Sequence, residues 1–193
     1  MKKMICIGDS LTYGLGVPVG DSWVELLNRE SSCDVINKGI NGDTSGGMLA
    51  RLHRDVLEHQ PDLVFLMGGA NDFIMGCGLG VVRANLMAMV HQMYHARIPV
   101  ILGIEIAGDS AHVRQDWQQL ADFCQVNEKI RAMAEWLPGF CGAFQIPYVD
   151  LYREFGDAVR GREAEFFIDG VHPNVRGHRL IADSILKKME QLV

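Results

Sequence analysis

The stretch ICIGDSLTYG, residues 5–14, joins an apolar run to a polar, glycine-rich segment. A short apolar run that stops at a glycine predicts a buried strand ending at the edge of a sheet. In open α/β sheets, ligands bind outside the carboxyl ends of the strands, so Ser10 would lie where a reactive hydroxyl is useful. Asp9 precedes it and is a candidate substrate-binding residue. A plain turn can have the same local sequence, so this interpretation needs support from elsewhere in the chain.

That support comes from DGVHPN, residues 169–174, near the other end of the chain. A serine nucleophile needs a base, and the base needs an acid that orients it. His172 can take the serine proton, and Asp169 can accept a hydrogen bond from the other ring nitrogen. The alternative, a surface aspartate near an unrelated histidine, would be preferred if the chain did not also carry Ser10 at a strand end.

Between these two stretches, strand and helix patterns alternate. Strands are predicted over residues 3–8, 35–37, 62–67, 99–104 and 147–149. Helices are predicted after the capping residues Asp21 or Ser22 and Asp43 or Thr44, over residues 81–96 and 114–137, and after His172. Residues 73–80 and 105–113 are predicted loops. Five such alternations are typical of an α/β fold with a doubly wound parallel sheet.

Two further strand ends carry groups that can donate hydrogen bonds to an oxyanion. Gly42 follows the second predicted strand, and a glycine lets its backbone N–H approach a ligand closely. Asn71 follows the third strand with a side-chain amide, and the backbone N–H of Ser10 is another candidate donor. Taken alone, Gly42 is more typical of a left-handed turn and Asn71 of an Asx turn, so only the combination favours catalysis.

The composition is that of an ordinary globular protein with one domain over residues 1–193. Hydrophobic residues make up 48% and charged residues 22%, and the net charge of −6 argues against a nucleic-acid partner, which would need a basic patch. Five cysteines without C-x-x-C spacing indicate a reducing compartment and neither a disulfide framework nor a zinc site. The amino terminus is too short for a signal peptide, and no apolar run reaches transmembrane length. We therefore expect a cytoplasmic protein without membrane insertion.

The remaining histidines are interpreted as solvated side chains, mostly at polar helical positions. They are His53, His59, His91, His95, His112 and His178. His91 and His95 have the i, i+4 spacing of a metal-binding pair. However, no H-E-x-x-H pattern or third ligand accompanies them, so a metal site is not expected.

Four short blocks together carry a resemblance to a known family. They are GDSL at residues 8–11, NGDT at 41–44, GAND at 69–72 and DGVHP at 169–173. Their content and order resemble the SGNH (GDSL) hydrolase superfamily, and the chain looks most like its bacterial single-domain esterase, thioesterase and lysophospholipase branch. The blocks span nearly the whole chain, and each falls at a predicted strand end.

The resemblance implies a three-layer α/β/α sandwich with a five-stranded parallel sheet in the flavodoxin-like order 2-1-3-4-5. It implies Ser10 as nucleophile, His172 as base and Asp169 as the acid that orients it, with an oxyanion hole built from Ser10, Gly42 and Asn71. The expected activity is hydrolysis of small soluble carboxylic esters or thioesters through an acyl-enzyme on Ser10, without a cofactor or metal. A carbohydrate O-acetylesterase on the same scaffold and a non-catalytic binding module are the alternatives.

The acyl pocket is predicted from the apolar loop at residues 73–80, directly after Asn71. Phe73 and Ile74 would form one wall, with Ile106 and Trp117 on the facing side. Phe73 and Ile74 could equally pack into the core, as such residues commonly do. Because the loop is too short for a helical cap, we expect a small pocket and a preference for short acyl chains.

Overall fold

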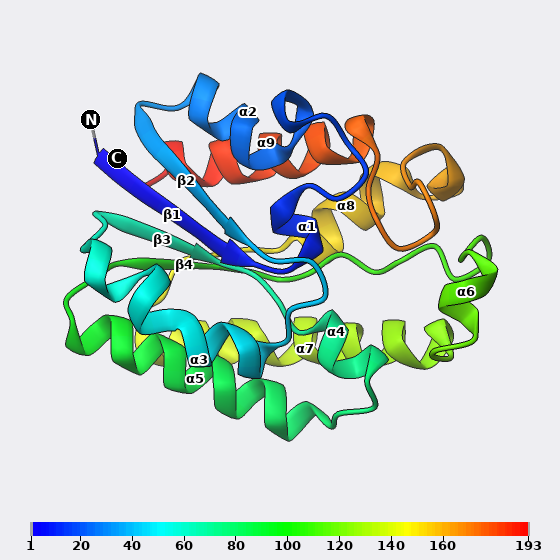
Figure 1. The fold of residues 1–193 in the computed structure, drawn as a ribbon, viewed down its shortest axis with the longest axis horizontal. Coiled ribbons are helices and arrows are strands. Elements are labelled where there is room, and N and C mark those ends of the chain that lie inside the picture. Colours follow the sequence, from blue (N-terminus) through cyan, green and yellow to red (C-terminus); the bar gives the residue numbers. More distant parts are fainter. Residues whose placement is uncertain (1, 193) are drawn as a thin grey trace.

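The structure, a computed structural model, describes residues 2–192. Its centre is a parallel five-stranded sheet with the order β2-β1-β3-β4-β5 (Figure 1). The strands are β1 (Lys2–Gly8), β2 (Cys33–Gly39), β3 (Leu63–Leu66), β4 (Val100–Gly103) and β5 (Tyr148–Val149). The expected doubly wound sheet and its strand order are thus confirmed.

Helices cover both faces of the sheet and give three layers. They are α1 (Ser10–Tyr13), α2 (Trp23–Glu30), α3 (Ser45–Asp55), α4 (Ala70–Ile74), α5 (Leu79–His95), α6 (Gln115–Gln118), α7 (Phe123–Phe144), α8 (Leu151–Val159) and α9 (Val175–Glu190). In Figure 1, α2, α8 and α9 lie on one face and α3, α5 and α7 on the other. The short helices α1, α4 and α6 lie toward the end to which the strand arrows point.

Strand β1 shows how the sheet divides the core into two halves. Ile5 and Ile7 pack in the cluster that contains the buried residues of α3, α5 and α7. Met4 and Cys6 pack in the other cluster, with those of α2, α8 and α9. Side chains alternate between the two faces of a strand, so a strand that is apolar at every position is buried on both sides. All four side chains are fully buried.

The predicted caps begin the first two long helices. The Ser22 hydroxyl accepts a hydrogen bond from Glu25 N at 3.3 Å, and α2 starts at the next residue. The Thr44 hydroxyl accepts from Gly47 N at 3.1 Å, and α3 starts at Ser45. Each cap satisfies an N–H that has no partner within its helix.

The single long helix expected over residues 114–137 is wrong. The chain forms the short α6, breaks, and begins again as α7 because the Asp122 carboxylate accepts from Cys124 N at 2.9 Å and caps a new helix. The segment 138–146, which had no predicted structure, mostly continues α7, with Pro138 inside the helix. Packing of the apolar face of α7 against the sheet outweighs the hydrogen bond that this proline removes.

Helix α8 was not predicted, although the sequence carries its signals. Leu151, Phe155 and Val159 are buried at i, i+4 and i+8, the spacing of one helical face. The Asp150 carboxylate caps the helix by accepting from Arg153 N at 3.1 Å.

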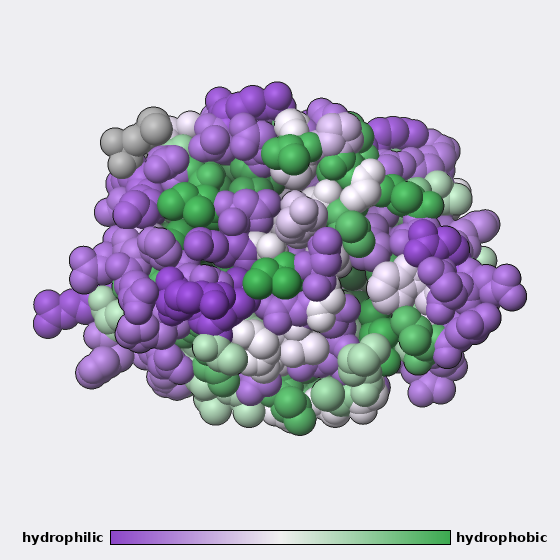
Figure 2. Space-filling view, viewed as in Figure 1, coloured by the Kyte–Doolittle hydropathy of each residue, from purple (hydrophilic) through white to green (hydrophobic). Residues whose placement is uncertain are grey.

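The surface of the molecule is mainly polar. Figure 2 shows hydrophilic side chains over most of one face, with hydrophobic patches scattered between them. Across residues 2–192, none of the helices combines the length and the apolar character that crossing a bilayer requires.

Candidate active site

The structure brings Ser10, His172 and Asp169 together at the carboxyl end of the sheet. The Ser10 Oγ lies 3.0 Å from His172 Nε2. On the other side of the ring, His172 Nδ1 lies 2.9 Å from Asp169 Oδ2 and 3.1 Å from Oδ1. All three residues are less than a tenth exposed. An ionised carboxylate only accepts hydrogen bonds, so Nδ1 carries the ring proton and Nε2 is free to accept from the serine.

Tight packing at the end of β1 fixes the position of Ser10. Asp9 caps the four-residue helix α1, its Oδ1 accepting from Leu11 N at 2.9 Å. A Cβ on Gly8 would lie 2.1 Å from Thr12 Oγ1 and 2.6 Å from Met67 O. Only glycine therefore fits where the chain leaves the strand and turns to present the serine.

The turn that carries His172 is held by its own aspartate and by a neighbouring loop. Asp169 Oδ1 accepts from His172 N at 2.8 Å, which fixes both ends of the turn. Asp109 N donates to Gly170 O at 2.8 Å, and Arg114 N donates to Asp169 O at 2.9 Å. Gly170 has φ +80°, and a Cβ there would lie 2.6 Å from the backbone of the same loop. The predicted loop at 105–113 is therefore a support for the histidine turn.

Asp169 is held in its ionised form. Burial opposes its ionisation, but hydrogen bonds from the side chain and the backbone of His172, together with the charge of the ring, hold its pKa below the usual range. Trp117 Nε1 also donates to Asp169 Oδ2, at 3.1 Å. The indole ring packs near the His172 ring, with centroids 5.6 Å apart. Trp117, which was predicted as a pocket wall, donates its indole N–H to Asp169, a contact for which the sequence gives no signal.

Gly42 lies after the end of β2, and Asn71 lies after the end of β3. Asn71 Nδ2 donates to Asp43 O at 2.9 Å and makes a longer contact of 3.3 Å to Asp9 Oδ2. Gly42 has φ +75° and is exposed, with open space around the position of a side chain. The Asp43 carboxylate, next in the chain, is anchored by Arg51 Nε at 2.7 Å.

The Asp9 side chain is not accessible to a substrate in this structure. Its side chain is fully buried, which corrects the expectation that it binds substrate. Burial raises the pKa of Asp9, while hydrogen bonds from Glu105 and from Leu11 N act in the opposite direction. Glu105, a further buried acid of this edge, was not singled out from the sequence.

Phe73, Ile74 and Ile106, predicted as walls of the acyl pocket, pack mainly in the core. Phe73 and Ile74 lie in and at the end of α4, where the sequence predicted a loop, and both pack in the core cluster on the α5 and α7 side of the sheet. Ile106 packs in the opposite cluster. These apolar side chains are each 6% exposed or less, because burial in the core removes more apolar surface from water than an open pocket would.

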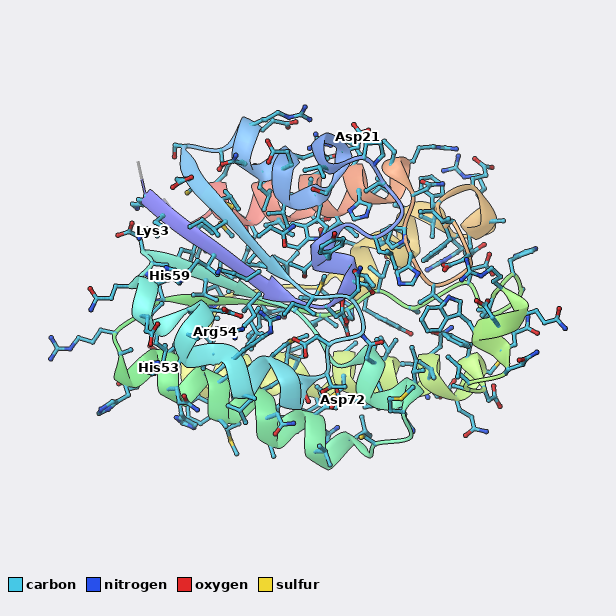
Figure 3. The ribbon with its side chains drawn as sticks, in the orientation of Figure 1. Lys3, Asp21, His53, Arg54, His59 and Asp72 are labelled. Carbon is cyan, nitrogen blue, oxygen red and sulfur yellow. The ribbon has the colours of Figure 1, made fainter. Side chains whose placement is uncertain are left out.

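The other histidines divide into solvated and buried ones. His53 and His59, labelled in Figure 3 on α3 and the turn after it, are exposed, as are His91 and His95 on α5. His178 is fully buried, which corrects its interpretation as a solvated side chain: its Nδ1 accepts from Trp23 N at 3.2 Å. No cluster of three or more potential metal ligands occurs in the described part of the chain.

The arrangement has the parts that acyl transfer requires. A serine hydroxyl faces an unprotonated imidazole nitrogen, and a buried carboxylate stabilises the imidazolium that forms when the ring takes the proton. The neighbouring strand ends carry Gly42, with its backbone N–H, and Asn71, with its side-chain amide, and both groups can donate hydrogen bonds.

Comparison with known proteins agrees with this chemistry. Residues 6–180 match the model of the GDSL-like lipase/acylhydrolase family. The thioesterase 1/protease 1/lysophospholipase L1 of Escherichia coli is 27% identical over 193 residues, covering 98% of this chain and 84% of that protein. An arylesterase of Vibrio mimicus is 39% identical over 94 residues, a match that spans 46% of this chain and 47% of the arylesterase.

A solved structure extends the likeness to the whole fold. A member of the lipolytic protein G-D-S-L family from Veillonella parvula superimposes with a TM-score of 0.83 at 28% identity, covering 96% of each chain.

Proposed function

We propose, from the premise that this chain belongs to the GDSL-like lipase/acylhydrolase family and is a carboxylic ester hydrolase, that Ser10 is its nucleophile. The observation that carries this proposal is the 3.0 Å approach of Ser10 Oγ to His172 Nε2, with Asp169 on the far side of the ring. A serine needs a base in contact and an acid behind that base to become nucleophilic at neutral pH.

The proposed reaction has two stages, acylation of Ser10 and hydrolysis of the acyl-enzyme. Ser10 Oγ attacks the acyl carbon as His172 Nε2 takes its proton, and Asp169 stabilises the imidazolium. His172 returns the proton to the leaving oxygen or sulfur, which leaves the acyl group on Ser10. A water molecule that gives its proton to His172 attacks the acyl-enzyme, and the acid is released as Ser10 regains its proton.

The tetrahedral oxyanion would be stabilised by the backbone N–H groups of Ser10 and Gly42 and by the amide of Asn71. Of the two contacts of Asn71 Nδ2, the one to Asp43 O is short and the one to Asp9 Oδ2 is long, at 3.3 Å. The hydrogen in the longer contact is therefore the one we expect the oxyanion to share with Asp9 Oδ2.

The substrates we propose are small soluble carboxylic esters and thioesters. The enclosed cavity near Asn71, bounded by Phe73 and Glu105, measures about 20 Å³, which leaves room for a single water and none for an acyl chain. The acyl group would instead lie against exposed apolar side chains of this edge, Ile40 after β2 and Ile168 before Asp169. Such an open surface gives short chains most of the available contact.

We also propose a cytoplasmic location, with a small-molecule ester as the partner. Support comes from the cysteines, all five of which are free thiols, as a reducing compartment would keep them.

The role of Ser10 can be tested by covalent labelling with a fluorophosphonate. Wild type should take up one probe per chain, and Ser10→Ala should take up none and lose turnover of an aryl ester to near background. Ser110→Ala, which removes an exposed serine from the loop beside the histidine turn, is the matched control and should label normally. Labelling of Ser10→Ala at wild-type rate would assign the nucleophile to another hydroxyl.

The substrate class can be tested with one series of aryl esters from acetyl to palmitoyl. We expect the highest kcat/KM between acetyl and about hexanoyl, with each added methylene contributing up to ~0.8 kcal/mol only while it still finds contact. Preference for palmitoyl over butyryl would contradict the open-surface interpretation. A much higher rate on an acetylated sugar would favour a carbohydrate O-acetylesterase.

A further inference from the structure

A pair of buried carboxyl groups, Asp9 and Glu105, lies beside Ser10 and takes no part in the proposed reaction. Asp9 is the residue between β1 and α1, and Glu105 follows β4 on the next strand but one of the sheet. Asp9 is fully buried and Glu105 is 7% exposed. Their carboxyl groups are held at neighbouring residues, since Glu105 accepts from Ala70 N and Asp9 contacts the amide of Asn71, and each group shifts the pKa of the other.

A hydrogen bond between two carboxyl groups requires a proton on one of them, because an ionised carboxylate only accepts. Asp9 accepts at both oxygens, at Oδ1 from Leu11 N and at Oδ2 from Asn71 Nδ2. Glu105 Oε2 accepts from Ala70 N at 2.6 Å. Glu105 Oε1 is buried, and none of the N–H or O–H donors within residues 2–192 reaches it. Glu105 Oε1 is therefore the oxygen that the bonding pattern leaves to carry the proton.

We propose that Glu105 is a positioning residue that remains protonated in the folded protein, donates through Oε1 to Asp9, and thereby holds Asp9 against the amide of Asn71. The pair then carries one negative charge in place of two. Its consequence for turnover rests on the proposed function, in which Asn71 stabilises the oxyanion.

The surroundings favour the neutral form of Glu105. Burial raises its pKa well above the ordinary value, and the negative charges of Asp9 and Asp72 act in the same direction. Asp43 also adds negative charge near Asp9, and His172 is the group that opposes it. The small cavity beside Glu105 is lined mostly by apolar side chains, so it offers an ionised carboxylate little solvation.

Arg51, a cation at this edge, is already engaged with other groups. Arg51 donates to Gly8 O at 2.9 Å and forms ion pairs with Asp43 and Asp55. Asp72, labelled in Figure 3, accepts from the backbone N–H and the hydroxyl of Ser45. Both donors are neutral, so they do not cancel the negative charge that Asp72 places near Glu105.

A second negative charge on the pair would oppose catalysis. The oxyanion develops where Asn71 donates, and Asn71 Nδ2 lies 3.3 Å from Asp9 Oδ2. Ionisation of Glu105 would add like charge near the oxyanion and would break the hydrogen bond that orients Asp9. A protonated Glu105 avoids both effects.

The proton on Glu105 can be detected independently of catalytic activity. The measurement compares the stability of wild type and Glu105→Gln as a function of pH. Glutamine keeps a donor toward Asp9 and an acceptor for Ala70 N but cannot titrate. A group with a raised pKa in the folded state stabilises the fold below its unfolded pKa, and this contribution is lost as pH rises toward the folded pKa. From about pH 5 to about pH 8, the folding equilibrium constant of wild type should fall relative to that of Glu105→Gln, by up to about tenfold per pH unit.

Glu190→Gln, which replaces an exposed glutamate at the end of α9, is the matched control and should show no such trend relative to wild type. A constant difference between wild type and Glu105→Gln across this range would mean that Glu105 is ionised in the folded protein, and would overturn the proposal.

Turnover tests the positioning role separately. Glu105→Leu, which cannot hydrogen-bond to Asp9, should lower kcat by about 10²-fold with KM within about twofold, since it acts on a transition-state donor. Glu105→Gln should restore kcat to within about threefold of wild type. Equal loss of kcat in both variants would show that the charge of Glu105 is needed, against the proposal. If Asn71 had no catalytic role, neither variant would change kcat, while the stability trend of Glu105→Gln would persist.

Discussion

His172 in the turn before α9 and His178 inside α9 are six residues apart and both buried, yet their ring nitrogens have opposite partners. Nδ1 of His172 faces the Asp169 carboxylate, and its Nε2 faces Ser10 Oγ. Nδ1 of His178 accepts a hydrogen bond from Trp23 N, and its Nε2 has no partner within the described residues. One ring is therefore set to accept a proton at Nε2, and the other already carries its proton there.

The difference shows that burial does not make a histidine a base. Burial lowers the pKa of His178 to about 4, and the charge of His172 adds to this, so His178 stays neutral at ordinary pH. His172 is equally buried but stands against a carboxylate that stabilises its charged form. The partner of Nδ1 decides whether the opposite nitrogen can serve as a base.

The largest expected effect comes from substituting each histidine separately. Similar losses of activity in the two variants would contradict the contrast between them. We expect His172→Ala to lower kcat by about 10⁶-fold, since a serine without its base loses nearly all of the advantage of the catalytic group. His178→Asn is the matched variant, because the asparagine oxygen can take the place of Nδ1 as the acceptor for Trp23 N. Its kcat on a short aryl ester should stay within about threefold of wild type.

A comparable loss in both variants would contradict this contrast and would place His178 in the catalytic machinery. Circular dichroism of both variants separates loss of activity from loss of fold.

The second expected effect is on the pH dependence of the unfolding free energy, which should differ between wild type and His178→Asn. A histidine whose pKa is lowered on folding stabilises the protein above its unfolded pKa of about 6.5, and this contribution is lost as pH falls toward the folded value of about 4. The difference amounts to about 3 kcal/mol of unfolding free energy between these limits. Urea titrations of wild type between about pH 7 and pH 4 should show this loss, and those of His178→Asn should lack it.

Other groups, Asp169 among them, also lose stabilisation in acid, so only the difference between the two proteins reports on His178. Parallel stability curves for wild type and His178→Asn would mean that the buried ring is protonated with little cost.

The sequence could place the strand ends but could not identify the partners of buried polar groups. Ser10, Asn71 and His172 each follow or precede an element whose pattern was clear, and parallel strands bring their carboxyl ends to one edge. His178 lies on a helix at a position that the sequence pattern predicts to be polar, and the packing of α9 against its neighbours, α2 among them, buries it. Burial set by tertiary contacts is not visible in a local pattern.

The same limit explains the acyl pocket. Phe73 and Ile74 follow Asn71 closely and are apolar, which is equally consistent with a pocket wall and with the core. The sequence does not single out Glu105, because one acid after a strand resembles any loop residue. Its role depends on Asp9, which follows a different strand. The break between α6 and α7 did have a local signal, the capping Asp122, which an apolar pattern over a longer window conceals.

The smallest expected effect concerns how far the orientation of His172 depends on groups beyond Asp169. Trp117 Nε1 donates to the same Asp169 Oδ2 that faces His172 Nδ1, at 3.1 Å and 2.9 Å respectively, so the indole fixes the direction of that oxygen. Trp117→Phe keeps an aromatic ring beside His172 but removes this donor. A hydrogen bond to a charged group contributes about 1.5–3 kcal/mol when buried, and Asp169 retains its other donors, so we expect a loss of about 1 kcal/mol, or about fivefold in kcat.

Trp136→Phe, in which a tryptophan of α7 that stacks on Phe140 is changed, is the matched control and should keep wild-type kcat. If Trp117→Phe equals wild type and only Trp117→Ala is slow, the ring packs against His172 without orienting its acid, and the carboxylate alone accounts for the difference between the two histidines.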